Sequence, residues 1–444
     1  MASSASPEIP SSVLIVGSGA FGLSTAWALC RDPQFKNTAI TVVDRQTFPT
    51  PDGSSIDTSR IIRPDYAAAP YTKLATIAQE RWRTDFATEH YHQVGLCITA
   101  SGIEQTYVSS SLHNVRAIGT DKIEVLDSGP EIARACGLEG KDEWGSGSTG
   151  YVNWSSGWAD AEGAMIWLRE EVEKLNRVKF IVASVKKLLI NHTTNTVSGV
   201  RLADSTHLTA DLTILAAGAW TASLIDLRGI CKATGQPICY MPISAAEEAR
   251  LAPHPTLLNL STGLFMIPPS NRLLKLARHG HGYLNPTTIP HPESDDPNNT
   301  ITISLPHTHI DNPAQSVPRE AQTQCRAFLT AIHPSLSTPS RPFTKTKICW
   351  YADTRDGDFL ISYHPVYKNL FVATGGSGHG FKFLPVIGEA IVRCVMGRTP
   401  EEFRGRWEWP SERVGEELWR GDGSRGGPVG MVLSEEVARG AGRL

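Results

Sequence analysis

The sequence predicts an α/β fold of two domains, one built on a parallel sheet and one on a mixed, more antiparallel sheet. Residues 13–44 have the order strand, glycine turn, helix, strand, which is a βαβ unit and therefore part of a parallel sheet. Strands that run into glycine turns recur near residues 215 and 374, so the parallel-sheet domain is expected to be assembled from separated segments. A length of 444 residues is typical of about two domains.

Each element is predicted from its local pattern: β-branched runs favour strands, and apolar residues three or four apart favour helices. Asp160 is expected to be the N-cap of a helix. The proline-, glycine- and aspartate-rich stretches 47–66 and 286–299 are expected to be loops, the second of them exposed. In chain order, strands are predicted at 13–16, 39–43, 178–200, 212–215 and 370–374, and helices at 20–29, 70–88, 161–175, 319–332 and 385–394.

These elements divide the chain into two domains and a tail. The segments that carry the strand-to-glycine turns form the nucleotide-binding domain, and the intervening segments form the substrate domain. The predicted bounds are 10–90, 150–230 and 340–400 for the first, 91–149 and 231–339 for the second, and 401–444 for a C-terminal extension over the surface.

Composition restricts the classes of partner. The net charge is −3, with 41% apolar and 20% charged residues, which is ordinary for a globular protein and gives no reason to expect a nucleic-acid or membrane partner. No apolar run approaches the roughly 18 residues of a membrane span. The eight cysteines are scattered without zinc spacing, so we expect a reduced, intracellular protein without a metal site.

The two ends of the chain bear on localisation. Residues 1–10 do not have the pattern of a secretory signal. The final Gly442-Arg443-Leu444 loosely resembles the Ser-Lys-Leu peroxisomal signal, with Gly as a poor substitute for Ser. We therefore expect a cytoplasmic or peroxisomal protein that is not secreted.

The first glycine turn is a GxGxxG motif in the context of a Rossmann-type dinucleotide site. It follows a strand and opens a helix, and an acidic residue, Asp44, lies 22 residues after Gly22, close to the expected spacing. The helix N-terminus favours the charge of a pyrophosphate, and Asp44 would accept hydrogen bonds from the ribose. The predicted contacts are Gly17, Gly19, Ala20, Phe21, Gly22, Asp44 and Arg45.

The motif alone does not distinguish NAD from FAD. Residues 213–220, with the sequence Thr-Ile-Leu-Ala-Ala-Gly-Ala-Trp, resemble the second flavin-contacting segment of FAD oxidoreductases. An ordinary buried strand and turn is the alternative interpretation. We favour FAD and add Ala217, Gly218 and Trp220 to its predicted contacts.

Three further motifs complete a family pattern. With the glycine turn at 16–22, they comprise DTSRIIRPDY at 57–66, KICWY at 347–351 followed by Thr354 and DGD at 356–358, and GGSGHGFKF at 375–383. The chain thereby resembles the FAD-dependent amine oxidases that include monomeric sarcosine oxidase, pipecolate oxidase, fungal saccharopine oxidase and the fructosyl amino acid oxidases. The resemblance covers nearly the whole chain and is weakest at 101–150 and after residue 407.

The resemblance implies a covalent flavin. In the family, the cysteine of the KxCWY-type motif forms a thioether with the flavin 8-methyl carbon, and here that residue is Cys349. Such chemistry needs a thiolate, so a nearby positive charge is expected, and Lys347 is a candidate. The other flavin contacts implied by matching motif positions are Ser59, Arg60, Gly378, His379, Gly380, Phe381 and Lys382.

The resemblance also assigns catalytic roles. Arg60 and Lys382 match positions that bind the substrate carboxylate or the flavin edge, and Arg63 matches an arginine that binds the carboxylate. Lys275 matches an oxygen-activating lysine, and His279, four residues on, matches an active-site histidine, although the sequence at 268–272 departs from the pattern. Tyr66 and Tyr363 are further cleft candidates whose more ordinary interpretation is structural.

The expected function is therefore that of a flavin-dependent oxidase of a secondary amine or amino acid of the sarcosine, pipecolate or saccharopine type. It would convert the C–N bond to an imine and reduce O2 to H2O2. The alternatives are a fructosyl amino acid (Amadori) oxidase, a biosynthetic oxidase of a specialised amine, an NAD-dependent dehydrogenase and a non-catalytic binding protein. The family also implies a monomer.

Overall fold

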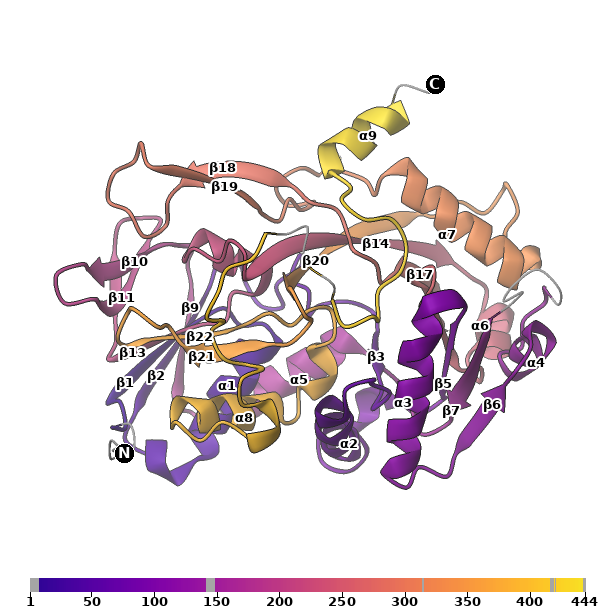
Figure 1. Ribbon diagram of the computed structural model, residues 1–444, viewed down its shortest axis with the longest axis horizontal. Coiled ribbons are helices and arrows are strands. Elements are labelled where there is room, and N and C mark those ends of the chain that lie inside the picture. The colour runs from indigo at the N-terminus through magenta and orange to yellow at the C-terminus, as the bar shows by residue number, and fades with distance from the viewer. Residues whose placement is uncertain (1–7, 141–147, 314, 416–418, 420, 442–444) are drawn as a thin grey trace.

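The computed structural model describes residues 8–140, 148–313, 315–415, 419 and 421–441. Two large sheets dominate it, and Figure 1 shows the first on the left and the second on the right. The first has six strands in the order β21 (Leu360–Tyr363), β22 (Leu370–Thr374), β13 (Leu212–Leu215), β1 (Ser12–Val16), β2 (Ala39–Asp44) and β9 (Val178–Val182). All neighbouring pairs are parallel except β21–β22, and the strands come from three separated parts of the chain.

The second sheet has eight strands and is mainly antiparallel. Its order is β20 (Lys345–Thr354), β14 (Cys231–Pro242), β17 (Leu273–Arg278), β16 (Leu264–Ser270), β15 (Thr256–Asn259), β5 (Leu96–Ala100), β7 (Thr149–Asn153) and β6 (Ile123–Leu126). Only β15–β5 is parallel in this sheet. The predicted combination of a discontinuous parallel sheet and a mixed sheet is confirmed.

Three small sheets complete the strands. They are β10 (Val185–Asn191), β11 (Thr196–Leu202) and β12 (His207–Thr209); β3 (Arg60–Ile62), β8 (Gly157–Ala159) and β4 (Tyr91–His92); and β18 (Pro286–Pro290) with β19 (Thr300–Ser304). The helices are α1 (Ala20–Arg31), α2 (Ala69–Thr84), α3 (Gln105–Ala117), α4 (Gly129–Ala135), α5 (Ala161–Lys174), α6 (Ala245–Leu251), α7 (Arg319–Ile332), α8 (Ile387–Val395) and α9 (Leu433–Ala441).

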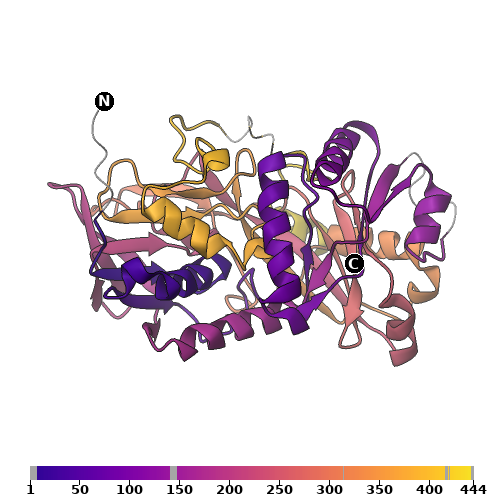
Figure 2. The same cartoon turned by 90° about the horizontal axis from the view of Figure 1, so that it is seen from below.

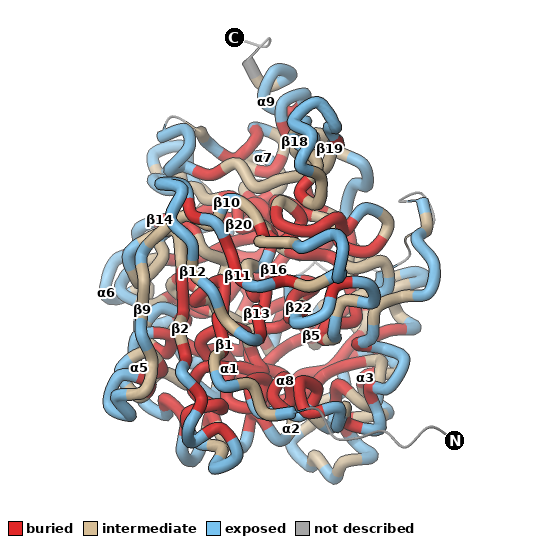
Figure 3. The backbone as a smooth tube through the Cα atoms, turned by 90° about the vertical axis from the view of Figure 1, so that its left-hand side faces the viewer, coloured by how far each residue is buried: buried red, intermediate tan, exposed pale blue. Residues whose placement is uncertain are grey.

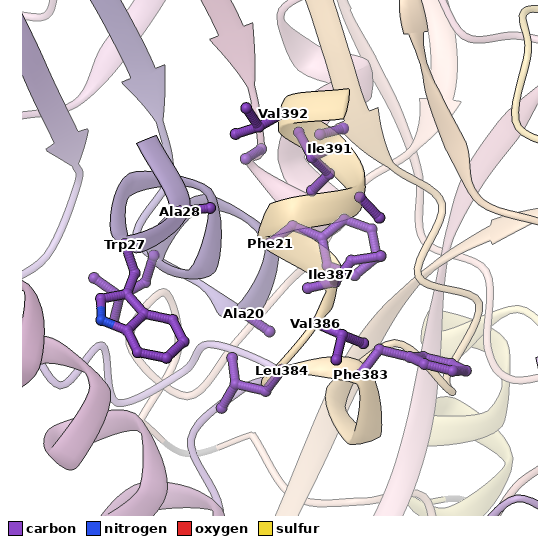
Figure 4. Close-up of a cluster of buried hydrophobic side chains, with 14 of the residues drawn as sticks. Ala20, Phe21, Trp27, Ala28, Phe383, Leu384, Val386, Ile387, Ile391 and Val392 are labelled. Carbon is purple, nitrogen blue, oxygen red and sulfur yellow. The ribbon is translucent and has the colours of Figure 1, made fainter. Parts of the chain in front are cut away.

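Helices α1, α5 and α8 pack against the six-stranded sheet, as the view from below shows (Figure 2). Figure 4 shows Phe21 of α1 beside Ile387 and Ile391 of α8 within this buried cluster. The two helices approach closely because Gly388 has no side chain: a Cβ there would lie 1.9 Å from the Ser24 carbonyl oxygen. Figure 3 shows that buried residues occupy the centre of the molecule and that exposed residues lie around its outside.

One face of the eight-stranded sheet is covered by a helix, and the other face points to the interior of the molecule. Helix α7 covers one face with apolar residues spaced by three and four, and Leu274 and Leu276 of β17 pack into that cluster. Because side chains alternate along a strand, Lys275 and Ala277 point to the opposite face. That face lines the candidate active site.

Several predictions of local structure were wrong. The stretch 286–299 is not entirely a loop, because Thr287 to Ile289 pair with Ile301 to Ile303 in the β18–β19 hairpin, whose prolines sit at the strand ends. Residues 60–62, within the predicted loop 47–66, form β3, and helix α9 lies in the predicted surface extension. Helix α5 begins as predicted, with the Asp160 side chain accepting from the Gly163 amide.

No helix in the described ranges is long and apolar enough to cross a membrane.

Candidate active site

The GxGxxG turn lies at one end of a cavity of about 850 Å³. Gly17 has φ +107°, and a Cβ there would lie 2.5 Å from the carbonyl oxygen of Ala216, the residue after β13. Only glycine therefore allows the turn to pack against this end of β13. Gly22 approaches Gly17 so closely that a Cβ would lie 1.9 Å from the Gly17 oxygen. Gly19 differs, since a Cβ there would meet only the Ser55 hydroxyl, at 3.4 Å, and would otherwise extend into the cavity.

These glycines allow a prediction that separates folding from cofactor binding. Gly22→Ala should lower the melting temperature of the apoprotein, because its methyl group overlaps backbone atoms. Gly19→Ala should leave the apoprotein melting temperature nearly unchanged and weaken FAD binding, because its methyl group occupies space that the pyrophosphate needs. Thermal unfolding with and without added FAD checks both. Equal melting temperatures and equal FAD stabilisation in the two variants would contradict this assignment.

The remaining walls of the large cavity suit a dinucleotide. Asp44 lines it, although its Oδ2 already accepts from the Ser18 amide at 2.7 Å and the Ser18 hydroxyl at 2.8 Å. Arg45 forms an ion pair with Asp52, and its guanidinium carbon lies 4.2 Å from the centre of the Trp220 ring. The other predicted contacts that line this cavity are Gly17, Gly19, Ala20, Phe21, Arg60, Ala217, Gly218, Trp220, Gly378, Gly380 and Phe381.

A second, smaller cavity of about 70 Å³ adjoins the first. Arg60, Tyr351, Gly378 and Phe381 line both cavities, so they lie at the boundary between the two. The other predicted site residues that line the smaller cavity are Ser59, Arg63, Lys275, His279, Cys349, His379 and Lys382. The catalytic candidates that are far apart in the sequence therefore lie around one cavity.

Cys349 is buried on β20, with 1% of its surface exposed, opposite Gln236 of β14. The cation in contact with it is Arg60, whose Nη2 lies 3.4 Å from Sγ. Lys347, the candidate from the sequence, instead donates to backbone carbonyls, including that of Ile56 at 2.8 Å. The expected positive charge next to the thiol is present, and the cation in contact with the thiol is Arg60.

Asp57 connects the cations of the site, a role that the sequence did not reveal. Its Oδ2 accepts from Lys275 Nζ at 2.8 Å and from Arg60, and its Oδ1 accepts from the Tyr240 hydroxyl at 2.5 Å. Burial opposes ionisation of Asp57, but Lys275 and Arg60 outweigh it and hold its pKa well below the usual range. Burial lowers the pKa of Lys275 to about 8, with Asp57 limiting the decrease.

Arg63 and Lys382 are buried cations that make no ion pair among the described residues. Nη1 of Arg63 has no hydrogen-bond partner, and Nη2 reaches only the Tyr107 hydroxyl, at 3.4 Å. Lys382 Nζ donates to the Tyr66 hydroxyl and to the His379 carbonyl, each at 2.9 Å. Burial and the charge of Arg63 pull the pKa of Lys382 well below its ordinary value. Asp65 and Asp422 interact with these cations only from beyond ion-pair distance, so the pair is suited to binding an anionic ligand group.

His279 lies at the cavity directly after β17, so the unusual sequence at 268–272 does not displace it. Asn271 and Arg272 form the tight turn between β16 and β17 with φ 52° and 57°. The His279 ring lies 6.0 Å from the Tyr351 ring, and Nε2 is 3.5 Å from the Ser424 hydroxyl. Burial and the neighbouring Arg425 lower the pKa of His279 well below its ordinary value, so the ring is neutral.

The C-terminal tail packs behind residues of the site, a contact that sequence analysis missed. Arg425 forms an ion pair with Asp353 at 2.6 Å and donates to the carbonyls of Gly280 and Ser377. These contacts fix the tail beside His279. Tyr363, a cleft candidate, lies elsewhere: it is 38% exposed and donates to the Val395 carbonyl.

Comparison with known proteins gives a consistent result. A family model described as FAD dependent oxidoreductase matches residues 12–394. The chain is 31% identical to amino acid oxidase imqH of Aspergillus flavus, over 90% of this chain and 98% of that protein. It is also 31% identical to L-saccharopine oxidase of Schizosaccharomyces pombe, over 92% of this chain and 95% of that protein.

Solved structures with the same fold include a modified fructosyl peptide oxidase from Aspergillus nidulans, with a TM-score of 0.84 and 26% identity over 97% of this chain and 99% of that one. Amadoriase I from Aspergillus fumigatus matches with a TM-score of 0.80 and 26% identity over 97% of this chain and 96% of that one.

Proposed function

The chain belongs to the FAD-dependent oxidoreductase family, and from this premise we propose that it is an oxidase of a secondary amine or amino acid. It converts the C–N bond of that substrate to an imine and passes the electrons to O2, which yields H2O2. The observation that carries the proposal is a pair of buried cations, Arg63 and Lys382, that form no ion pair among the described residues and line a cavity next to the dinucleotide cavity.

The residues present fit FAD. The pyrophosphate would lie at the glycine turn and the N-terminus of α1, because the Gly19 position is open to the cavity. Asp44 would hold the ribose. The isoalloxazine ring would lie where the two cavities share Arg60, Tyr351, Gly378 and Phe381. When bound, FAD supplies the hydride acceptor for the substrate and the donor for O2.

Cys349 is the proposed attachment point of the flavin. Its Sγ faces the Arg60 guanidinium at 3.4 Å, and a neighbouring cation stabilises the thiolate that nucleophilic chemistry needs. The other seven cysteines are also buried, but none of them lines either cavity. Cys349 is therefore the cysteine best placed for a bond to the ring.

Arg63 and Lys382 orient the substrate through its carboxylate. A carboxylate between them would accept hydrogen bonds from both cations, including one from the free Arg63 Nη1. The wall formed by Ile238, Phe265 and Ala277 excludes water from the C–H bond to be broken. Because the amine can bind in its neutral form, the reaction needs no strong side-chain base, and the main contribution of the protein is orientation.

Lys275 assists the reaction with O2. Its ammonium lies on the cavity face of β17, next to Ala277, and hydrogen-bonds to Asp57 and to the Ser59 carbonyl, at 2.7 Å for the latter. A fixed positive charge at this point stabilises the negative charge that develops on O2 as it accepts electrons. Arg60, which is held by Asp57, adds a second charge.

The substrate class is tested by peroxide release. We expect activity with sarcosine, pipecolate or saccharopine, consistent with the similarity to L-saccharopine oxidase and to the sarcosine oxidases. The second candidate is an Amadori oxidase, which the similarity to fructosyl peptide oxidase structures favours. A screen that also contains fructosyl-valine and fructosyl-lysine separates the two. Peroxide from neither group, with flavin bound, would count against the proposed function.

We further propose that the enzyme is a monomer and that the two predicted domains have the bounds stated from the sequence. The candidate peroxisomal signal, Gly442-Arg443-Leu444, lies outside the described residues. Fusion of the last ten residues to a fluorescent protein would test it. Cytoplasmic fluorescence would leave the cytoplasm as the proposed location.

A further inference from the structure

The hydroxyl of Tyr66 connects two groups at the substrate cavity. It lies 2.9 Å from Lys382 Nζ and 2.9 Å from His379 Nδ1. Tyr66 is 2% exposed, and Lys382 and His379 are also buried. No family motif assigned a role to this hydroxyl, and its aromatic ring alone would fill the same space.

The direction of these hydrogen bonds is determined by a carbonyl group. His379 Nε2 lies 2.8 Å from the Gly357 carbonyl oxygen, which can only accept, so Nε2 must carry a proton. Burial and the charge of Lys382 lower the pKa of His379 to about 3, so the ring is neutral and Nδ1 has a free lone pair. Nδ1 therefore accepts the proton of the Tyr66 hydroxyl, and the Tyr66 oxygen presents its lone pairs to Lys382.

This direction provides an acceptor for a charged lysine. An ammonium has three N–H donors, and in the described contacts Lys382 uses one on Tyr66 and one on the His379 carbonyl. The third is left for a ligand. Both acceptors are neutral, so they favour the protonated lysine without cancelling its charge.

The orientation of the His379 ring is fixed by neighbouring aromatic rings. It stacks on Phe359 with a centroid distance of 4.8 Å, and its edge meets Tyr71 at 5.1 Å. The backbone around it is constrained as well, because a Cβ on Gly378 would lie 2.4 Å from Tyr351. The imidazole therefore cannot turn away from the Tyr66 hydroxyl without repacking this cluster.

Other charged and titratable groups surround the hydrogen-bonded side chains of Lys382, Tyr66 and His379. They are Arg63, Asp65, Tyr107, His279, Asp422 and Arg425. Burial lowers the pKa of His279 and raises that of Tyr107 to about 12, so neither changes charge between pH 7 and about 10. Arg63 opposes protonation of Lys382, whereas Asp422 and Asp65 favour it.

We propose that Tyr66 and His379 are positioning residues that hold Lys382 as a directed cation for the substrate carboxylate. His379 accepts the proton of Tyr66, Tyr66 accepts from Lys382, and Lys382 binds the carboxylate together with Arg63. The inference rests on the proposed function, because it takes the ligand of Lys382 to be a carboxylate. It gives Tyr66 and His379 a role that they exert through the lysine.

The test measures binding of acetate to the oxidised holoenzyme from the change in its visible flavin band, between pH 7 and 10. Binding should be tight below the pKa of Lys382 and weaken as the pH rises through it, because the cation is lost. Tyr66→Phe removes an acceptor from the ammonium, so the transition should move to lower pH. At pH 8 the dissociation constant should rise roughly ten- to hundredfold, as for loss of a hydrogen bond to a charged group.

Three variants serve as controls. Tyr71→Phe removes a neighbouring buried hydroxyl that accepts from the Phe359 amide and Trp407 but does not reach Lys382, so its pH transition should match the wild type. His379→Leu removes the acceptor of the Tyr66 proton and should weaken acetate binding. His379→Gln keeps both an acceptor and a donor and should restore it. The Lys275 ionisation, common to all variants, does not produce a difference between them.

The outcomes are distinct. If acetate does not perturb the wild-type flavin band at any pH, a carboxylate does not bind beside the ring and the proposed function fails. If the wild type binds acetate with the expected pH dependence but Tyr66→Phe and His379→Leu show the same transition, the positioning role is overturned. Should Tyr66→Phe not fold, the contrast between His379→Leu and His379→Gln decides the question.

Discussion

Replacing Arg63 with methionine should lower kcat/KM for a secondary amino acid by roughly 30- to 700-fold, while making the protein more resistant to heat. The loss corresponds to about 2–4 kcal/mol for one partner of a buried charge pair. The gain arises because Arg63 is 5% exposed and forms no ion pair in the described part of the chain, with Nη1 unpartnered, and such a buried charge destabilises the folded state. Steady-state kinetics and thermal unfolding of the same preparation measure the two effects.

Arg278 is the matched control for stability. It is equally buried, at 1% exposure, but it donates to Glu320 and Gln324 at 2.8–3.0 Å. Arg278→Met should therefore lower the melting temperature, opposite in sign to Arg63→Met. If Arg63→Met were also destabilised, with little change in kcat/KM, Arg63 would be a structural residue and not a carboxylate ligand.

Replacing Lys275 with methionine should slow the reaction of the reduced enzyme with O2 by about 100- to 1,000-fold, the usual effect of removing one group that stabilises developing charge. Reduction by substrate should change far less, because Lys275 does not hold the carboxylate. In the wild type, the oxygen reaction should be fast below pH 8 and slow as the pH rises above it. The reason is that the pKa of Lys275, lowered by burial, is about 8 and only the protonated form carries charge.

Lys345→Met is the matched control for this prediction. Lys345 of β20 and Lys275 of β17 pair with Tyr240 of β14 from opposite sides, but Lys345 is exposed. Lys345→Met should leave the rate of the oxygen reaction and its pH dependence unchanged. Lys275→Met should abolish the decline of that rate above pH 8. Stopped-flow mixing of reduced enzyme with O2 measures both. Equal slowing of both half-reactions in Lys275→Met would mean that the lysine supports the structure of the site as a whole.

The parts of the site that the sequence predicts are those set by local pattern. Gly17, Gly22 and Asp44 lie within one βαβ unit, where turn geometry and strand order constrain them. Lys275 is identified from the resemblance of residues 273–279 to a family motif, and in the structure the alternation of side chains along β17 places it opposite Leu274 and Leu276. Such features need no knowledge of distant residues.

The parts that escaped prediction depend on contacts between distant segments. Asp57 forms hydrogen bonds with Tyr240 and Lys275, which lie 183 and 218 residues further along the sequence, and no local pattern predicts these contacts. Arg425 reaches the site from a tail that reads as a surface extension. The β18–β19 hairpin was misread because prolines mark loops in general, but are tolerated at the ends of an isolated two-stranded sheet.

We propose that this chain carries FAD bound covalently through Cys349, and one measurement tests this directly. Purified protein is denatured with acid and passed through a filter that retains the polypeptide, and flavin absorbance is read in both fractions. We predict that the flavin stays with the wild-type polypeptide and passes through the filter after Cys349→Ala. Flavin in the wild-type filtrate would contradict the covalent bond, and no flavin in either fraction of protein expressed with FAD available would contradict the assignment as a flavoenzyme.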